Sequence, residues 1–162
     1  MVLFKIGDYI AHPMHGAGVI ESIVTKKING AQRDYYVLKL PVGDMVVMVP
    51  VVGCEDIGVR AIISRSEAEN VFDAFNELEI SMTQNWNKRY RENMDKIKSG
   101  NLLDVAAVVK GLMRRDNERG LSTGERKMLH SAKQILISEL VVATDMDYDG
   151  VERRLCSALK EG

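Results

Sequence analysis

Trp86, the single tryptophan of this 162-residue chain, opens a strongly cationic segment, NWNKRYRENMDKIKSG, at residues 85–100. The cations that follow it directly are Lys88, Arg89 and Arg91. An aromatic ring beside cations at the start of a helix suits nucleic acid, because cations and helix-start amides pair with phosphates while the ring stacks or wedges against bases. The residue types therefore allow Trp86 to contact a nucleic acid.

The same segment also allows Trp86 to be an ordinary core residue. We expect Asn85 to cap a helix that starts at Trp86, because Asn is a preferred N-cap residue. Side chains at helical spacing then share one stripe with the tryptophan: Tyr90, Met94 and Ile97. The cations project from the flanks and the back of this stripe. From the residues alone, core and contact both stay open.

A second pair of cations stands in the segment GLSTGERKML. Arg126 and Lys127 fall in the expected first turn of another helix, where positive charge opposes the helix dipole. Because local stability favours anions there, the pair indicates another use. If both helix starts point the same way, the cations form one basic patch.

The charge is unevenly distributed along the chain, although the net charge is only −1. Residues 81–133 carry twelve Lys or Arg against six Asp or Glu, whereas residues 65–80 carry one against five. This local excess indicates an acidic partner such as nucleic acid. A solvated helix face is the alternative interpretation.

Metal and catalytic motifs are missing from the sequence. Cys54 and Cys156 lack CxxC spacing, and His12 and His15 have no carboxylate or Cys nearby to complete a metal site. No P-loop, G-x-S-x-G or paired cysteine–histidine motif occurs. We therefore predict no metal, no cofactor and no enzymatic activity.

The segment DMDYDG, residues 145–150, matches only the first half of a calcium-binding EF-hand loop. The position that needs a bidentate carboxylate is occupied by Cys156, a poor calcium ligand. We interpret the segment as an acidic turn in which Asp149 caps the last helix.

No apolar run approaches the roughly 18 residues that span a membrane, and the first ten residues are too mixed for a signal peptide. We expect a cytoplasmic protein without membrane contact.

The first fifty residues have the pattern of short strands. The segments are FKIGDYIAHP, AGVIESIVTKKI, AQRDYYVLKL and MVVMVP. Asn29-Gly30 separates the second from the third and predicts a type I′ hairpin turn, because both residues tolerate positive φ. Several short antiparallel strands in so few residues predict a small SH3-like or Tudor-like β-barrel.

The remaining residues have helical periodicity and predict a compact helical bundle, with a boundary near residue 60. Ser66 with Glu69, and Ser122 with Glu125, have the spacing of capping boxes. Gly120 predicts a helix end. The fold class is therefore α+β, with domains at residues 1–60 and 61–162.

The whole chain resembles the CarD/CdnL family of bacterial transcription regulators. The matching stretches are FKIGDYIAHPMHGAGVIESI, YYVLKLPVGDMVVMVP, NWNKRYRENMDKIKSG and RRDNERGLSTGERKMLHSAKQILISEL, in the order and spacing of the family. The resemblance implies a Tudor-like domain that binds the β subunit of RNA polymerase, similar to the module of transcription-repair coupling factors. It also implies a helical domain that contacts promoter DNA at the upstream edge of the melted region.

By matching position, the resemblance implies that Trp86 wedges into the DNA minor groove. The implied DNA-facing basic positions are Lys88, Arg89, Arg91 and Arg126, with Lys127 beside them. The implied polymerase-binding residues are Lys26, Val46, Val47 and Met48. Lys26 and Met48 stand where family members have arginine; the first change keeps the charge and the second removes it.

The expected function is that of a non-enzymatic, monomeric regulator that stabilises the open promoter complex without strong sequence preference. The alternative is a protein-only adaptor linking polymerase to another protein, whose binding lacks the steep salt dependence of DNA contacts.

Overall fold

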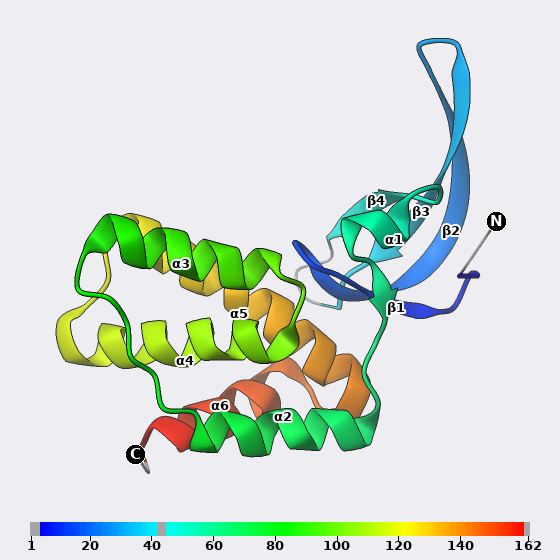
Figure 1. Ribbon diagram of the computed structural model, residues 1–162. Coiled ribbons are helices and arrows are strands. Elements are labelled where there is room, and N and C mark those ends of the chain that lie inside the picture. The colour runs from blue at the N-terminus through cyan, green and yellow to red at the C-terminus, as the bar shows by residue number, and fades with distance from the viewer. Residues whose placement is uncertain (1–3, 42–44, 161–162) are drawn as a thin grey trace.

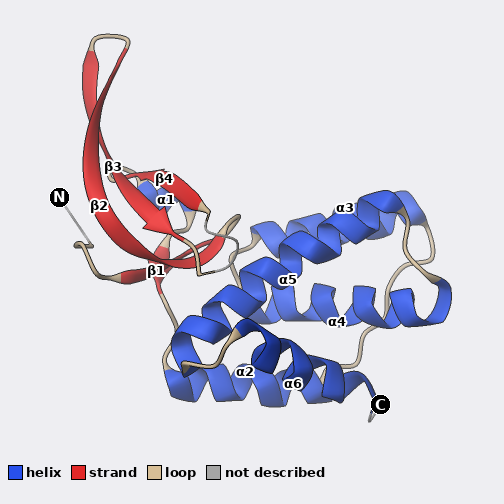
Figure 2. Cartoon of the chain, turned by 180° about the vertical axis from the view of Figure 1, so that it is seen from behind, coloured by secondary structure: helices blue, strands red, loops and turns tan. Residues whose placement is uncertain are grey.

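The computed structural model describes residues 4–41 and 45–160 and has an N-terminal sheet and a C-terminal helical body (Figure 1). The first part contains β1 (Tyr9–His12), β2 (Gly16–Ile28), β3 (Ala31–Lys39), β4 (Val46–Pro50), α1 (Cys54–Ile57) and β5 (Arg60–Ala61). The second contains α2 (Arg65–Glu77), α3 (Trp86–Lys98), α4 (Leu102–Arg119), α5 (Thr123–Thr144) and α6 (Tyr148–Lys160). Apart from the short α1, strands and helices are segregated (Figure 2), which confirms the α+β class.

The strands form one antiparallel sheet in the order β4-β3-β2-β1-β5. Its inner face is closed by fully buried side chains: Ile10, Ile20, Tyr36, Leu38 and Val49. The four longer strands were predicted from alternation, from the Asn29-Gly30 turn and from an apolar run, whereas α1 and β5 are too short to leave such a pattern.

The β2–β3 hairpin projects well beyond the rest of the sheet (Figure 1). Asn29 and Gly30 both have positive φ, 51° and 82°, which confirms the predicted I′-like turn. Residues 25–34 are all exposed, so cross-strand contacts hold the outer hairpin without a core. One of them is the hydrogen bond that Thr25 Oγ1 donates to Asp34 Oδ1 at 2.6 Å.

The helical body is built around α4 and α5, whose buried faces supply most of its core. The buried face of α4 fits the helical periodicity of the sequence, and Gly120 ends that helix, as predicted, with φ 78°. No helix in the described ranges has the length and apolar character needed to cross a membrane.

Two predicted caps of the helical body are wrong. The capping box of α2 uses Ser64 and Glu67 instead of Ser66 and Glu69. Glu69 points away and binds Arg154 of α6 through two hydrogen bonds. At α6, Asp147 Oδ1 accepts a hydrogen bond from Gly150 N at 2.7 Å, so Asp147 takes the role expected of Asp149.

Candidate nucleic-acid interface

The N-terminal ends of α3 and α5 lie side by side at the end of the helical body far from the sheet (Figure 1). Both caps are as predicted: Asn85 Oδ1 accepts from Lys88 N at 3.0 Å, and Ser122 Oγ accepts from Glu125 N at 3.2 Å. Side-chain contacts between the two starts confirm that the helices meet here. Two positive dipole ends therefore face the same region of the surface.

Trp86 is fixed at this end without being part of the core. Its ring stacks on Tyr90 with centroids 5.1 Å apart and planes inclined by 20°. Its indole N–H donates to Ser122 Oγ at 3.1 Å, and a Cβ placed on Gly124 would contact the ring at 3.5 Å. Because 42% of the residue is still exposed, an aromatic surface remains available to a partner.

Arg89 does not project from the surface, and the prediction that places it there is wrong. Arg89 is only 2% exposed. Its guanidinium forms a bidentate pair with Glu125, Nε to Oε2 at 2.8 Å and Nη2 to Oε1 at 3.1 Å. Nη1 donates to the carbonyls of Thr83 and Gln84, both at 3.1 Å. Arg89 is therefore a structural residue beneath the interface.

The buried line of α3 is rotated by about one position from the predicted stripe. It consists of Arg89, Asn93 and Ile97, while Tyr90 and Met94 are only partly buried at its edge. This rotation leaves Trp86 on the rim of the helix, where it is half exposed.

Glu125 is directed toward Arg89, so its side chain does not complete the reciprocal half of the predicted capping box. The hydrogen bond from Arg89 lowers the pKa of the Glu125 carboxyl, against the effect of burial, and Arg115 nearby lowers it further. The carboxylate therefore stays ionised and the ion pair holds.

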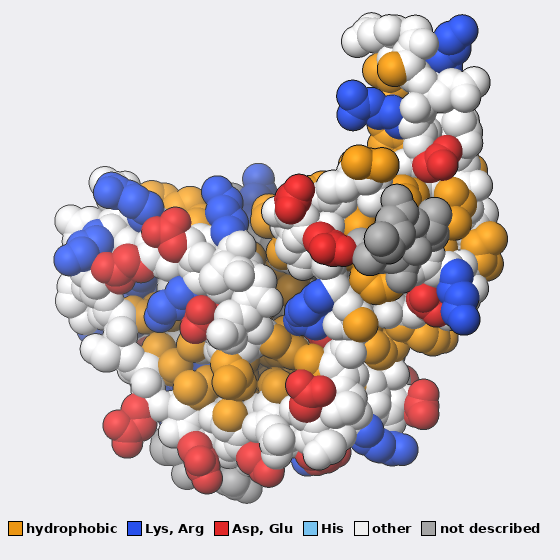
Figure 3. Space-filling view, turned by 45° about the vertical axis from the view of Figure 1, so that its right-hand side comes forward, with side chains coloured by type: hydrophobic (Ala, Val, Ile, Leu, Met, Phe, Trp, Pro, Cys, Tyr) orange, Lys and Arg blue, Asp and Glu red, His pale blue; other side chains and the backbone are white. Residues whose placement is uncertain are grey.

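The other predicted cations are exposed at this end: Lys88 and Arg91 on α3, and Arg126 and Lys127 on α5. Arg126 also donates to Leu121 O at 3.3 Å across the start of its helix. Figure 3 shows Lys and Arg side chains together with acidic groups over the helical body. The exposed cations can therefore meet phosphates directly.

Four residues near the interface were not predicted from the sequence. Ser122 is one, since its spacing indicated a cap but not an anchor for Trp86. The others are Arg114, Arg115 and Arg119, which line a cavity of about 200 Å³ together with Gln84 at the start of α3. In sequence they look like ordinary cations at a helix C-terminus, which suit the dipole.

In the sheet, away from this end of the helical body, β4 forms a free edge. The bonds from Leu40 N to Met45 O and from Val51 N to Asp34 O set the alternation of this antiparallel pair. The main-chain groups of Val46 and Met48 consequently point away from β3, toward the open edge.

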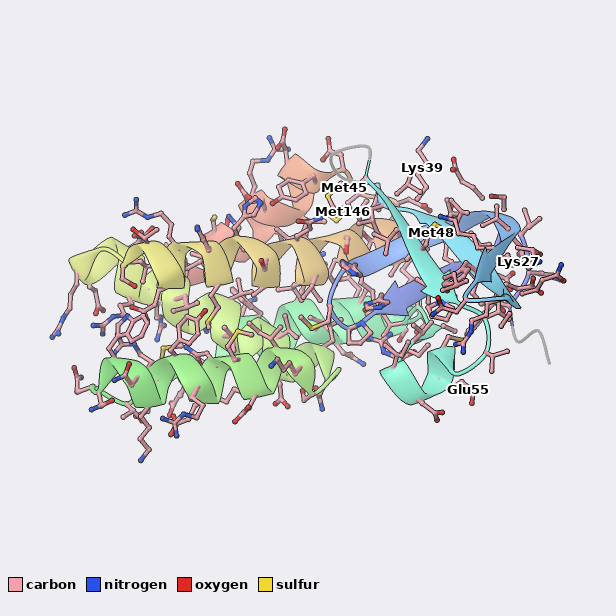
Figure 4. The ribbon with its side chains drawn as sticks, turned by 90° about the horizontal axis from the view of Figure 1, so that it is seen from above. Lys27, Lys39, Met45, Met48, Glu55 and Met146 are labelled. Carbon is pink, nitrogen blue, oxygen red and sulfur yellow. The ribbon has the colours of Figure 1, made fainter. Side chains whose placement is uncertain are left out.

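The predicted polymerase-binding side chains lie on and near this edge. Val46 is 54% and Met48 37% exposed, while Val47 is partly buried against the sheet core. Lys26 is exposed on the projecting hairpin. Figure 4 shows Met45 near the helices, with Met48 and Lys27 farther out along the sheet.

Comparison with known proteins identifies both parts of the chain. Residues 4–63 match the family model described as "CarD-like/TRCF RID domain", and residues 70–156 match "CarD, C-terminal domain". A Bacillus subtilis (strain 168) protein named "Putative transcription factor YdeB" is 38% identical over 140 residues, 86% of this chain and 92% of that protein.

The two matches define a transcription regulator whose N-terminal sheet is a Tudor-like domain. The chain belongs to the CarD/CdnL family. The predicted family resemblance is thereby confirmed. The proposed division at residue 60 stays a prediction.

The buried pair predicts a large asymmetry between single and double substitution. Arg89→Met leaves the Glu125 carboxylate buried without a partner, so we expect a loss of about 3–5 kcal/mol in the free energy of unfolding. Arg89→Met combined with Glu125→Met removes both charges and is expected to recover most of that loss. Urea denaturation measures both variants.

Arg91→Met is the matched control, because it removes an exposed cation from the same helix. We expect it to change stability by less than about 0.5 kcal/mol. If Arg89→Met were equally mild, the ion pair would not hold α3 to α5.

Proposed function

We propose that this regulator binds the β subunit of RNA polymerase through its N-terminal sheet and stabilises the open promoter complex by a minor-groove contact of Trp86. The contact lies at the upstream edge of the melted region. The observation that carries the proposal is a half-exposed indole fixed between two helix N-termini and flanked by exposed cations.

The fixed ring supports a wedge role. Stacking on Tyr90 and the hydrogen bond to Ser122 already restrict its rotamers, so less side-chain entropy is lost on binding. Unstacking a base step in an intact duplex costs a few kcal/mol. At the edge of a bubble the stack is already distorted, so the indole acts where this cost is lowest.

The surroundings of the ring support contact with phosphates on both sides of a groove. Lys88 and Arg91 extend from α3, and Arg126 and Lys127 from α5. The first-turn amides of both helices add oriented donors. These contacts carry no sequence information, which suits a regulator that acts at many promoters.

The edge of β4 supports the polymerase contact. Its outward main-chain groups offer a template for strand addition, which needs no particular side chain. Met48 can therefore replace the arginine of the resembling family members without loss of the main-chain pairing. Lys26 retains a positive charge on the hairpin, although without the guanidinium fork.

The two contacts act together through linkage. A cationic patch alone binds DNA weakly, at about 10⁻⁴ to 10⁻⁶ M. Tethering to polymerase raises the effective concentration of the patch at the promoter. The regulator then favours the melted state by its difference in affinity between the open and closed complexes.

We expect Trp86→Ala to shorten the lifetime of the open complex by about tenfold without changing affinity for polymerase. An aromatic contact with a base contributes about 1–3 kcal/mol. Competitor-challenge assays on a promoter fragment measure the lifetime. Leu103→Ala is the control, since Leu103 is 45% exposed on α4 and Trp86 42% on α3.

Equal lifetimes for wild type and Trp86→Ala would refute the wedge, provided that circular dichroism shows both proteins folded. Shortening by Leu103→Ala to the same degree would assign the effect to lost apolar surface in general.

The salt dependence separates the DNA contact from the protein-only adaptor. Each phosphate contact contributes about 0.9 to the slope of log affinity against log salt. We expect Lys88→Gln with Arg91→Gln to reduce this slope by about 1 to 2 in fluorescence titrations of bubble DNA. Lys5→Gln with Arg153→Gln, two exposed cations outside the interface, should leave it unchanged. A flat salt response of the wild type would favour the adaptor.

Strand addition at β4 predicts that Met48→Pro weakens binding to the polymerase β subunit by about tenfold. Proline removes the outward N–H, whereas the ladder to β3 uses other residues and remains intact. Met48→Ala keeps the main chain and should bind nearly normally by calorimetry. Equal losses in both variants would show that the side chain, not the strand edge, makes the contact.

A further inference from the structure

Helix α5 is joined to the N-terminal sheet by two consecutive buried residues. Ser138 Oγ accepts a hydrogen bond from Ala17 N of β2 at 2.9 Å. The Glu139 carboxylate accepts hydrogen bonds from Nη1 and Nη2 of Arg60 in β5, at 2.7 and 2.9 Å. It also accepts one from Ile63 N at 3.0 Å. Both Ser138 and Glu139 are 1% exposed, so these two side chains are withheld from solvent.

The backbone of β2 lies directly on α5 beside these residues. Gly16 has φ +92°, and a Cβ built there would be 2.3 Å from Ser138 Oγ and 3.2 Å from the Ile135 Cα. A side chain at this position would push the sheet off the helix. Close approach therefore depends on glycine here.

The Glu139 carboxylate has a partner only when the sheet is docked. All hydrogen bonds that it accepts within the described residues come from Arg60 and Ile63, which precede the helical body. Undocking would leave a buried carboxylate without its cation, which is strongly unfavourable. His12 lines the same junction. Burial, and to a smaller extent repulsion from His15, lowers the pKa of His12 to about 4, so its imidazole is neutral at pH 7 and adds no charge to the junction.

Helix α5 connects this junction to the candidate interface. Its N-cap Ser122 anchors Trp86, and Glu139 lies seventeen positions later, about 25 Å along the axis at 1.5 Å per residue. An uninterrupted helix transmits position over this length with little bending. The place of the indole is therefore tied to the place of the sheet.

From this geometry we infer that Arg60, Ser138 and Glu139 form a clamp that makes α5 a rigid spacer between the polymerase-binding sheet and Trp86. The three are positioning residues, since none of them reaches either proposed contact surface. The spacer function rests on the proposed function, whereas the clamp itself does not. With the clamp in place, a protein tethered to polymerase holds the indole at one fixed distance along the DNA. A loose joint would let the indole sample many positions.

Glu139→Ala is the most direct test of the clamp. It removes the buried charge and leaves Arg60, whose side chain is 37% exposed, free to reach water. Ser138→Ala is the milder second variant if Glu139→Ala folds poorly. Glu69→Ala is the matched control, because it breaks another bidentate arginine pair, with Arg154, inside the helical body.

Distances between nitroxide labels report on the clamp without DNA or polymerase. Labels on Gln32→Cys in the hairpin and Ser131→Cys on α5, in a Cys156→Ser background, should give one narrow distribution in the wild type and in Glu69→Ala. We expect a clearly broader one in Glu139→Ala and an intermediate one in Ser138→Ala. Unchanged widths in both variants would overturn the clamp.

The lifetime of the open complex then tests the spacer. We expect Glu139→Ala to shorten it by about tenfold, as the effective concentration falls, while affinities for the isolated β subunit and for bubble DNA stay unchanged. A broadened distribution with a normal lifetime would overturn the spacer. If Trp86→Ala also leaves the lifetime normal, the proposed function itself fails, and the label distances still decide the clamp.

Discussion

The ion pair between Arg89 and Glu125 is the interaction on which the candidate interface depends. Both side chains are 2% exposed, so the two charges are stabilised mainly by each other and by hydrogen bonds. The guanidinium, carried by α3, binds two other segments at once: Glu125 at the start of α5, and the carbonyls of Thr83 and Gln84 in the connection from α2. This arrangement needs the planar fork of arginine, which lysine lacks. Trp86 is held three residues before Arg89, and Ser122 three residues before Glu125, so the pair fixes both partners of the indole contact.

A buried glutamate paired with an arginine from another element occurs twice along α5. Glu125 and Glu139 are fourteen residues apart, which is close to four turns, so the two carboxylates lie on nearly the same face of the helix. Each accepts a bidentate arginine from a different element, Arg89 of α3 and Arg60 of β5. Buried carboxylates are expensive unless paired, so both arginines must be in place for the helix to pack. A single helix thereby specifies where the sheet and the start of α3 lie.

Much of the fold follows from the sequence because it depends on local patterns. Alternation predicted the first strand, Asn29-Gly30 the hairpin, an apolar run the last long strand, and the caps at Asn85 and Ser122 two helix starts. The segment SRSEAE has the spacing of two overlapping capping boxes, from Ser64 and from Ser66; the first forms, and Glu69 pairs with the distant Arg154 instead of closing the second. Local spacing carries no information about that choice.

The burial of Arg89 could not be predicted for a related reason. Periodicity assigns arginine to the solvent side, and its partner Glu125 is thirty-six residues away in sequence. The family resemblance also placed Arg89 among surface cations, since matching positions say nothing of burial. The prediction for Trp86 stayed open between a core residue and a DNA contact, because a helical stripe allows only those two interpretations.

The structure gives a third outcome for Trp86, because the buried line of α3 runs through Arg89 and Asn93 instead. The indole is supported from below by Tyr90 and at its N–H by Ser122, yet 42% of the residue faces solvent. A ring held this way keeps apolar surface in water, which costs stability relative to full burial. That cost is consistent with a surface kept for a partner, and the free β4 edge lies in the sheet, away from the end of the helical body that carries Trp86. Two contacts so far apart suit simultaneous binding of two partners, because neither partner covers the surface that the other needs.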